Sequence, residues 1–169
     1  MPASSEGRHS EGAGARFIAD AMLGRLARWL RLLGFDVLYY RDADDLELMR
    51  IARAEGRTIL TRDTRLDRRM GSGASVLISS DHLREQLLQM RDLLDFGFAA
   101  PQGRCDVCNG LLEEVADRCE VRDLVPEHVY RSSPAFFRCP SCGRIYWQGT
   151  HYRSFQEGLD ALRGGRHED

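Results

Sequence analysis

An alternation of strands and helices begins at Arg16-Phe-Ile-Ala-Asp20-Ala-Met-Leu-Gly24-Arg-Leu-Ala-Arg28-Trp-Leu-Arg-Leu-Leu-Gly34. The run that ends at Asp20 is short and apolar, which is typical of a buried strand. After it, apolar side chains recur at helical spacing with arginines between them. These apolar positions are Met22, Leu23, Leu26, Trp29, Leu30 and Leu33. Gly34 is suited to cap a helix end, so the stretch predicts a strand followed by an amphipathic helix.

Three further strands are expected downstream, at residues 35–40, 58–61 and 74–79. Because strands alternate with helices, the chain predicts βαβ units with right-handed crossovers. The expected fold class is therefore α/β, with a parallel sheet flanked by helices.

Two more helices are expected between and after these strands. The first is capped by Asp44 or Asp45 and ends near Glu55, and the second starts near Asp81. The buried side of the first is expected to consist of Leu46, Leu48, Met49, Ile51 and Ala52. Between the third and fourth strands, a basic loop is expected at Arg65, Arg68 and Arg69.

Composition excludes some kinds of chemistry. All 24 basic residues are arginine, so reactions that need a lysine amine are excluded. The formal charge of −2 does not by itself indicate nucleic-acid binding. We find no apolar run long enough to span a bilayer and no charged-then-apolar leader, so we expect a cytoplasmic protein without a membrane partner.

Shifts in composition divide the chain into five expected segments. Residues 1–15, rich in Gly, Ser and Ala, are expected to form a disordered tail. Residues 16–96 are the expected α/β domain, and residues 97–103 a linker. Residues 104–153 form a cysteine-containing module, followed at 154–169 by a C-terminal helix and tail.

Acidic residues follow the expected strands. Asp20 and Asp63 follow the first and third strands, Asp44 or Asp45 begins the second helix, and Asp81 follows the fourth strand. In a parallel α/β sheet these positions share one edge, where such folds place their sites. Converging carboxylates repel one another unless a cation compensates, and hard oxygen ligands suit Mg²⁺ or Mn²⁺. Taken singly, each acid is better explained as a helix cap or turn residue, and only their coincidence favours a site.

Three arginines are candidate phosphate ligands. Arg25 and Arg28 lie one turn apart on the first helix, and Arg62 precedes Asp63. Guanidinium groups in these places could hold the backbone of a bound nucleic-acid strand. A solvated helix face, or local salt bridges to the acids, is an equally weighted alternative.

Two Cys-x-x-Cys pairs, separated by thirty residues, predict a metal site. Together they offer the four thiolates of a closed tetrahedral zinc site, namely Cys105, Cys108, Cys139 and Cys142. A thiol redox pair fits less well, because neither pair begins a helix in a βαβ unit. Without a secretory leader, metal binding is also favoured over disulfides. Cys119 is left over, and it or His128 could replace one ligand.

Aromatic residues and arginines alternate around the second pair. They occur at Tyr130-Arg131, Phe136-Phe-Arg138, Arg144-Ile-Tyr-Trp147 and His151-Tyr-Arg153. This pattern suits stacking on single-stranded nucleic acid. A small metal module also needs aromatic residues to build a core, and we expect that role for Phe136, Phe137 and Trp147.

Three segments in this order resemble a known family. They are Phe17 to Gly34 as quoted above, Gly56-Arg-Thr-Ile-Leu-Thr61-Arg62-Asp63, and Cys139-Pro-Ser-Cys142-Gly-Arg-Ile-Tyr-Trp147-Gln-Gly149-Thr-His151. Together they resemble the Mut-seven C-terminal RNase domain, a PIN-like nuclease domain fused to a zinc ribbon. The resemblance extends from Arg16 to about Leu162. It implies a PIN-like fold and divalent-metal cleavage of RNA.

The resemblance also implies roles for particular residues. The acidic roles pass to Asp20, Asp45 and Asp63, with Asp81 as a fourth, and the zinc ligands to Cys105, Cys108, Cys139 and Cys142. We therefore expect a ribonuclease that uses Mg²⁺ or Mn²⁺ on single-stranded RNA, with a structural zinc ribbon. Two alternatives stay open: a non-catalytic RNA-binding protein whose acids are caps, and a metal-dependent phosphohydrolase of small molecules.

Overall fold

The computed structural model describes residues 15–94 and 103–149, which fall into two compact units. The first unit holds residues 15–30 and 35–94, and the second holds 103–149 together with Arg31–Gly34. The predicted N-terminal tail, most of the predicted linker and the predicted C-terminal helix lie outside the described residues. The predicted domain boundaries therefore stay predictions.

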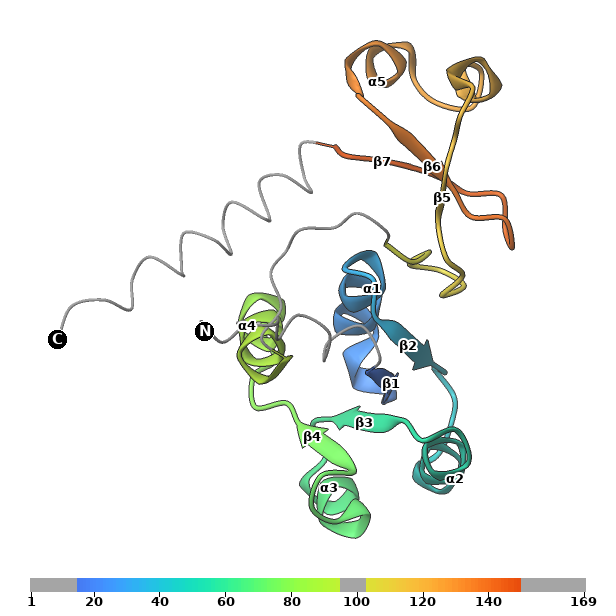
Figure 1. Cartoon of the computed structure of the whole chain (residues 1–169). Coiled ribbons are helices and arrows are strands. Elements are labelled where there is room, and N and C mark those ends of the chain that lie inside the picture. Colours follow the sequence, from blue (N-terminus) through green and yellow to red (C-terminus); the bar gives the residue numbers. More distant parts are fainter. Residues whose placement is uncertain (1–14, 95–102, 150–169) are drawn as a thin grey trace, which may run out of the picture. The chain divides into compact units, whose positions relative to one another are not determined.

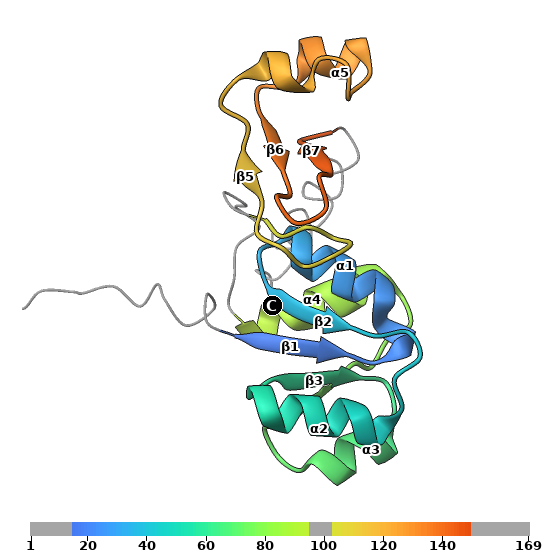
Figure 2. The same ribbon diagram turned by 90° about the vertical axis from the view of Figure 1, so that its right-hand side faces the viewer.

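The first unit is built on a parallel four-stranded sheet, as the alternation of strands and helices predicts. Its strands are β1 (Arg16–Ala19), β2 (Asp36–Tyr39), β3 (Thr58–Thr61) and β4 (Ser75–Leu77). Their order in the sheet is β2-β1-β3-β4, and all neighbours are parallel. The arrowheads of β1, β2 and β3 point to the same side in Figure 2, so the ends of these strands share one edge. We call this edge the carboxyl edge.

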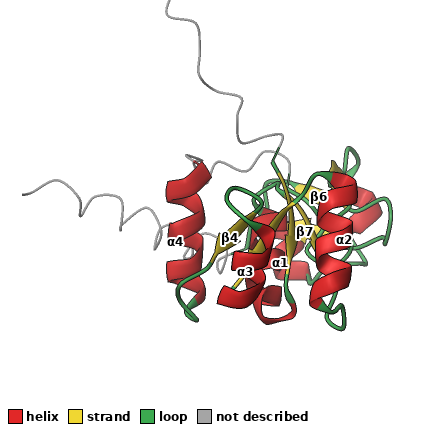
Figure 3. Ribbon diagram, turned by 90° about the horizontal axis from the view of Figure 1, so that it is seen from below, coloured by secondary structure: helices red, strands yellow, loops and turns green. Residues whose placement is uncertain are grey.

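Helices cover both faces of this sheet. They are a short 3₁₀ helix η1 (Ala21–Leu23), α1 (Gly24–Leu32), α2 (Asp45–Glu55), α3 (Thr64–Met70) and α4 (Leu83–Leu94). In Figure 1, α1 and α4 lie on one face of the sheet and α2 and α3 on the other. Viewed from below, α2 and α3 stand in front of the strands (Figure 3). The sheet is thus the middle of three layers and is apolar on both faces.

The core beneath α2 and α3 shows how the apolar pattern becomes packing. It consists of Ile18, Leu48, Met49, Ala52, Ile59 and Leu66, all buried. Leu48, Met49 and Ala52 form one stripe of α2, as expected from their spacing. Leu46 does not join them and is 66% exposed, so its predicted burial is wrong. Met22 is also 66% exposed, because the chain there forms η1 and has not yet entered the periodicity of α1.

The predicted basic loop after β3 is instead the helix α3. The Asp63 side chain caps its first turn, Leu66 is buried beneath it, and Gly71 follows its last residue with φ of 81°. Arginine has a good helix propensity, so a basic stretch between these two caps is compatible with a helix. A seven-residue helix with one buried side chain has little apolar periodicity from which to be predicted.

The order of the strands fixes where a ligand is expected. From β1 the chain passes to β2 on one side, and it later returns to place β3 on the other side of β1. Such a reversal opens a crevice beyond the carboxyl ends of the two central strands, where α/β sheets bind their ligands. Here the residues that follow those strands include Asp20 and Asp63.

The second unit contains a small antiparallel sheet of order β5-β6-β7. Its elements are β5 (Glu113–Glu114), η2 (Arg118–Val121), α5 (Glu127–Ser132), β6 (Phe136–Arg138) and β7 (Ile145–Trp147). Its core comprises Val121, Val125, Val129 and Phe136. Phe136 is buried as expected, whereas Trp147 is 36% exposed, so its predicted core position is wrong. None of the helices in the described ranges is long and apolar enough to cross a membrane.

We expect Arg57 to be a principal polar anchor of the first unit. Its guanidinium, 7% exposed, forms an ion pair with Asp36 at 2.8 Å and donates to the carbonyl of Phe17 at 3.2 Å. Removing one partner of a buried ion pair leaves the other charge without a partner. Arg57→Ala should lower the free energy of unfolding by about 3 kcal/mol, measured by urea denaturation. Arg53→Ala, an exposed change on α2, should cost less than about 0.5 kcal/mol, and equal losses would contradict this assignment.

Candidate functional site

Asp20 is a buried carboxylate at the carboxyl edge, 7% exposed. One oxygen, Oδ1, accepts the backbone N–H of Met22 at 2.8 Å and so caps η1. The other, Oδ2, accepts the hydroxyl of Thr61 and the backbone N–H of Arg62, the latter at 3.3 Å. These bonds offset the cost of removing the carboxylate from water. The chain thereby holds a negative charge at the point where β1 and β3 end.

Thr61 connects Asp20 to the second acid of this edge. Its hydroxyl, which donates to Asp20, also accepts the backbone N–H of Asp63 at 2.9 Å. Asp63 in turn accepts the N–H of Arg65 through Oδ1 at 2.7 Å and caps α3. Asp20 and Asp63 are therefore joined through one side chain. The role of Thr61 was not predicted, although a polar residue closing an apolar strand just before an acid was a signal for it.

The two acids at the start of α2, Asp44 and Asp45, have different roles. Asp44 caps the helix, since its Oδ1 accepts the N–H of Glu47 at 2.8 Å. Asp45 is the first residue of α2, and its Oδ2 lies 3.5 Å from the guanidinium of Arg69 on α3. The cap is thus Asp44, which leaves Asp45 as the acid whose side chain is not used to begin the helix.

Asp81 stands apart from the other acids. Its side chain is 68% exposed and lies 3.5 Å from His82, while Ser80, not Asp81, accepts the N–H of His82 before α4 begins. Among the described residues, the acids do not form a group of three or more ligands close together. Capping is confirmed for Asp44, and the structure adds Asp20 and Asp63 as the caps of η1 and α3. Metal binding by Asp20, Asp45, Asp63 and Asp81 stays a prediction.

The candidate phosphate ligands lie beside this edge. Arg25 and Arg28 are exposed side chains in α1, which begins directly after η1. Arg62 is half-buried and follows β3, with its backbone N–H committed to Asp20. No ion pair with an acid is recorded for Arg25 or Arg62 among the described residues. Their predicted role in substrate binding stays a prediction.

The two Cys-x-x-Cys pairs form matching turns. In the first, the N–H of Asn109 donates to the carbonyl of Cys105 at 2.9 Å, and in the second, Gly143 donates to Cys139 at 2.8 Å. Both donors have positive φ, 66° for Asn109 and 76° for Gly143. Asparagine and glycine are the residues that tolerate this left-handed conformation best. Each turn is therefore closed by its own backbone hydrogen bond.

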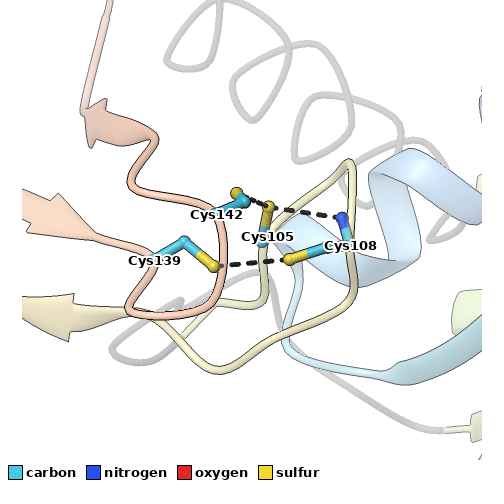
Figure 4. A group of neighbouring side chains, drawn as sticks. All are labelled: Cys105, Cys108, Cys139 and Cys142. Atoms are coloured by element: carbon cyan, nitrogen blue, oxygen red, sulfur yellow. Dashed lines mark hydrogen bonds between the residues drawn. The ribbon is translucent and has the colours of Figure 1, made fainter.

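The four sulfurs of these turns converge, as Figure 4 shows. Sγ atoms lie 3.5 Å apart for Cys105 and Cys142 and 3.4 Å apart for Cys108 and Cys139, and all four lie within 4.8 Å of one another. Tetrahedral zinc with Zn–S bonds of about 2.3 Å places its sulfurs about 3.8 Å apart. The predicted group of four is confirmed as a group able to hold a metal ion, and its all-sulfur chemistry suits zinc.

Tyr146 lies next to this group. Its hydroxyl is 3.0 Å from Sγ of Cys105 and donates to Asp106 at 2.7 Å. Burial, together with these two neighbours, raises the pKa of Tyr146, so it remains a hydroxyl. Burial also raises the pKa of the Cys105 thiol, but the contact with the Tyr146 hydroxyl and the hydrogen bond from the Cys108 N–H outweigh it and lower that pKa to about 6. Cys105 thus ionises more readily than Cys108 or Cys142, whose pKa values the neighbouring thiols raise.

The fifth cysteine, Cys119, is not part of this group. It is an exposed free thiol in η2, and the four converging cysteines exclude it. His128 is likewise exposed and outside the group. The alternative in which either replaces a ligand is therefore not supported among the described residues.

Loss of the Thr61 hydroxyl should loosen the acid pair. Thr61→Val keeps the shape of the side chain but leaves Asp20 without its hydroxyl donor and the N–H of Asp63 without its acceptor. We expect a loss of about 2 kcal/mol in the free energy of unfolding, measured by urea denaturation. Thr58→Val, at the other end of β3, removes a hydroxyl that has no recorded partner among the described residues. A loss as large for Thr58→Val would show that hydroxyl removal in this strand, not the bond to Asp20, is responsible.

Zinc binding should depend on four cysteines and not on the fifth. Purified wild type should carry about one zinc ion per chain, measured by plasma mass spectrometry. Cys142→Ser should lose most of that zinc and unfold at a lower temperature, because three thiolates bind the ion less tightly. Cys119→Ser is the matched control and should keep both properties. Zinc loss in Cys119→Ser with retention in Cys142→Ser would overturn the ligand assignment.

Comparisons with known proteins give one match. The family model described as the Mut7-C RNAse domain matches residues 15–159, which is most of the chain and spans both units. No curated protein and no solved structure matches. The match includes residues 17–34, 56–63 and 139–151, the three segments that carry the resemblance seen in the sequence. The chain belongs to the Mut7-C RNAse domain family.

Proposed function

We propose that this chain is a metal-dependent ribonuclease of PIN-like type that hydrolyses RNA phosphodiester bonds at the carboxyl edge of the first unit. One observation carries the proposal. Asp20 and Asp63 are joined through Thr61 at the strand-order reversal, in a chain of an RNase domain family. Helix capping accounts for one oxygen of each acid, but it gives no reason to bury Asp20.

The donor set at this edge fits a hard divalent ion. Asp20, Asp45 and Asp63 offer carboxylate oxygens, the ligands that Mg²⁺ and Mn²⁺ prefer, and Asp81, whose side chain is 68% exposed, is a fourth candidate. Oδ1 binds one N–H in both Asp20 and Asp63, and a carboxylate oxygen has lone pairs for more than one partner. Bound there, such an ion would lower the pKa of a water molecule and stabilise the charge on phosphate oxygens.

Residues of the chain itself hold the acids, and would hold the RNA, in position. Thr61 holds the Asp20 carboxylate in one orientation, and the caps hold Asp63 and Asp44 at the starts of their helices. Arg69 lies near Asp45 and partly neutralises it, as expected where several acids share one edge. Arg25, Arg28 and Arg62 would hold phosphates of the RNA on either side of the acids.

The cysteine module has a structural part in this proposal. Zinc held by Cys105, Cys108, Cys139 and Cys142 would close a unit whose own apolar core is small. Of the predicted RNA-stacking residues, Tyr130 is packed on Phe136, with rings 6.2 Å apart, and Arg118 lies over both rings. These rings are therefore used inside the module. Trp147, which is exposed, would be available to contact single-stranded RNA.

A cleavage assay tests the proposal directly. End-labelled single-stranded RNA is incubated with zinc-loaded protein, with and without added Mn²⁺, and products are resolved on a sequencing gel. We expect cleavage that requires Mn²⁺ and falls by at least about a hundredfold in Asp20→Asn/Asp63→Asn. Asparagine keeps the Oδ1 caps but replaces the Oδ2 acceptor of Asp20 with an amide donor, so circular dichroism checks that the double variant is folded, and Asp63→Asn alone replaces it if it is not. Asp42→Asn removes an exposed acid from the loop before α2 and should retain activity.

Other outcomes distinguish the alternatives. Binding of RNA without cleavage by wild type, with either Mn²⁺ or Mg²⁺ added, would replace the proposal with a non-catalytic RNA-binding protein. Turnover of phosphomonoesters that is indifferent to added RNA would favour a small-molecule phosphohydrolase. Equal cleavage by wild type and the Asp20/Asp63 double variant would move catalysis away from this edge.

A further inference from the structure

Three large apolar side chains are exposed at the carboxyl edge. Met22 and Leu46 are each 66% exposed and Tyr40 is 45% exposed. The first unit has four exposed large hydrophobic side chains among its described residues, and Leu93 is the only one away from this edge. Three of four on one edge is a clustering that the general exposure of apolar residues does not explain. We call Met22, Tyr40 and Leu46 the apolar rim.

Two of the three segments that carry the apolar rim contact each other, those of Met22 and Tyr40. Tyr39 donates its hydroxyl to the carbonyl of Ala21 at 3.1 Å. The same ring packs so closely on Gly24 that a Cβ there would lie 2.7 Å from its hydroxyl oxygen. The segment after β1, which carries Met22, is therefore fixed against the end of β2, which leads into Tyr40. The rim is part of a packed surface.

The apolar rim also adjoins the acids. Met22 donates its backbone N–H to Asp20, and Leu46 directly follows Asp45 in the first turn of α2. In Figure 2 the start of α2 and the turn that leaves β1 lie on the side to which the strands point. Carboxylates and large apolar side chains thus alternate along the same edge. A ligand that fits it has both a charged part and an apolar face.

We propose that the apolar rim contacts the faces of unpaired RNA bases beside the phosphate that the acids process. This inference rests on the proposed function, and it adds how the site selects its substrate. In an A-form duplex the base faces are stacked and out of reach, whereas unpaired bases expose them for contact with side chains. Such contacts are tolerant of sequence, because every base has a flat π-face. The rim would therefore select single-stranded or splayed RNA without reading its sequence.

Charge argues for RNA over a protein partner at this edge. The cores of protein interfaces are depleted of charged residues. Here Asp20, Asp45 and Asp63 lie among the rim residues, and exposed Arg25 and Arg28 lie on the adjoining helix α1. An RNA strand uses both features, since its phosphates meet the arginines while its bases meet the rim.

Paired RNA ligands test this inference. A fluorescent ten-nucleotide single strand is compared with the same strand carrying three central abasic sites. Affinity is measured by fluorescence anisotropy with zinc-loaded protein and no added Mg²⁺ or Mn²⁺, so binding is read without cleavage. Wild type should bind the complete strand about tenfold more tightly than the abasic strand. Met22→Ser/Leu46→Ser should bring that ratio close to one, while Leu93→Ser, an equally apolar change away from this edge, should preserve it.

Each result decides the matter. A ratio near one in wild type, or an unchanged ratio in Met22→Ser/Leu46→Ser, would overturn the inference. A wild-type dimer in light scattering that becomes monomeric in the double variant would show the rim to be a protein interface instead. Circular dichroism checks folding, and the single variants Met22→Gln and Leu46→Gln replace the double variant if it misfolds. The expected ratios without Mn²⁺-dependent cleavage would uphold base contact while the nuclease proposal fails.

Discussion

The buried carboxylate of Asp20 is the constraint on which the first unit depends. Removing a carboxylate from water is costly, and the chain offsets the cost with the N–H of Met22, the hydroxyl of Thr61 and the N–H of Arg62. Those donors come from the turn after β1 and from the end of β3. Satisfying one acid therefore fixes the separation of the two central strands at their carboxyl ends. The positions of Asp63 and α3 follow, because Thr61 also binds the N–H of Asp63.

The second unit depends on its four converging cysteines. Its apolar core is small, and its sheet has only short strands. Two self-contained turns present the cysteines, each closed by its own backbone bonds. The hydroxyl of Tyr146 lies against Sγ of Cys105 and donates a hydrogen bond to Asp106. An ion held by the four sulfurs would connect segments from both ends of the unit, as metals do in modules too small for a large core.

Much of the fold could be predicted from local patterns. The parallel sheet could be predicted from the apolar runs of β1 and β3 and from the apolar stripe of α2. The spacing of the cysteines predicted the group of four. The helix α3 could not be predicted from periodicity, because it buries one side chain between two caps. The exposure of Met22 and Leu46 could not be predicted for a related reason. Both residues lie at the starts of helices, where the spacing of apolar residues does not indicate which side chains are buried. Thr61 could be placed on a strand but not paired with Asp20, because that contact depends on the order of strands in the sheet.

The bond between Asp20 and Thr61 joins residues 41 positions apart. A chain emerging from the ribosome has β1, α1, β2 and α2 before it has Thr61 or Asp63. The acid pair is therefore incomplete until β3 has been synthesised and has docked against β1 by a long-range contact. Any hydrolytic activity at this edge is thus delayed until the sheet closes. Under the proposed function, the nascent chain, which is surrounded by ribosomal and messenger RNA, would carry its half-made site in an inactive form.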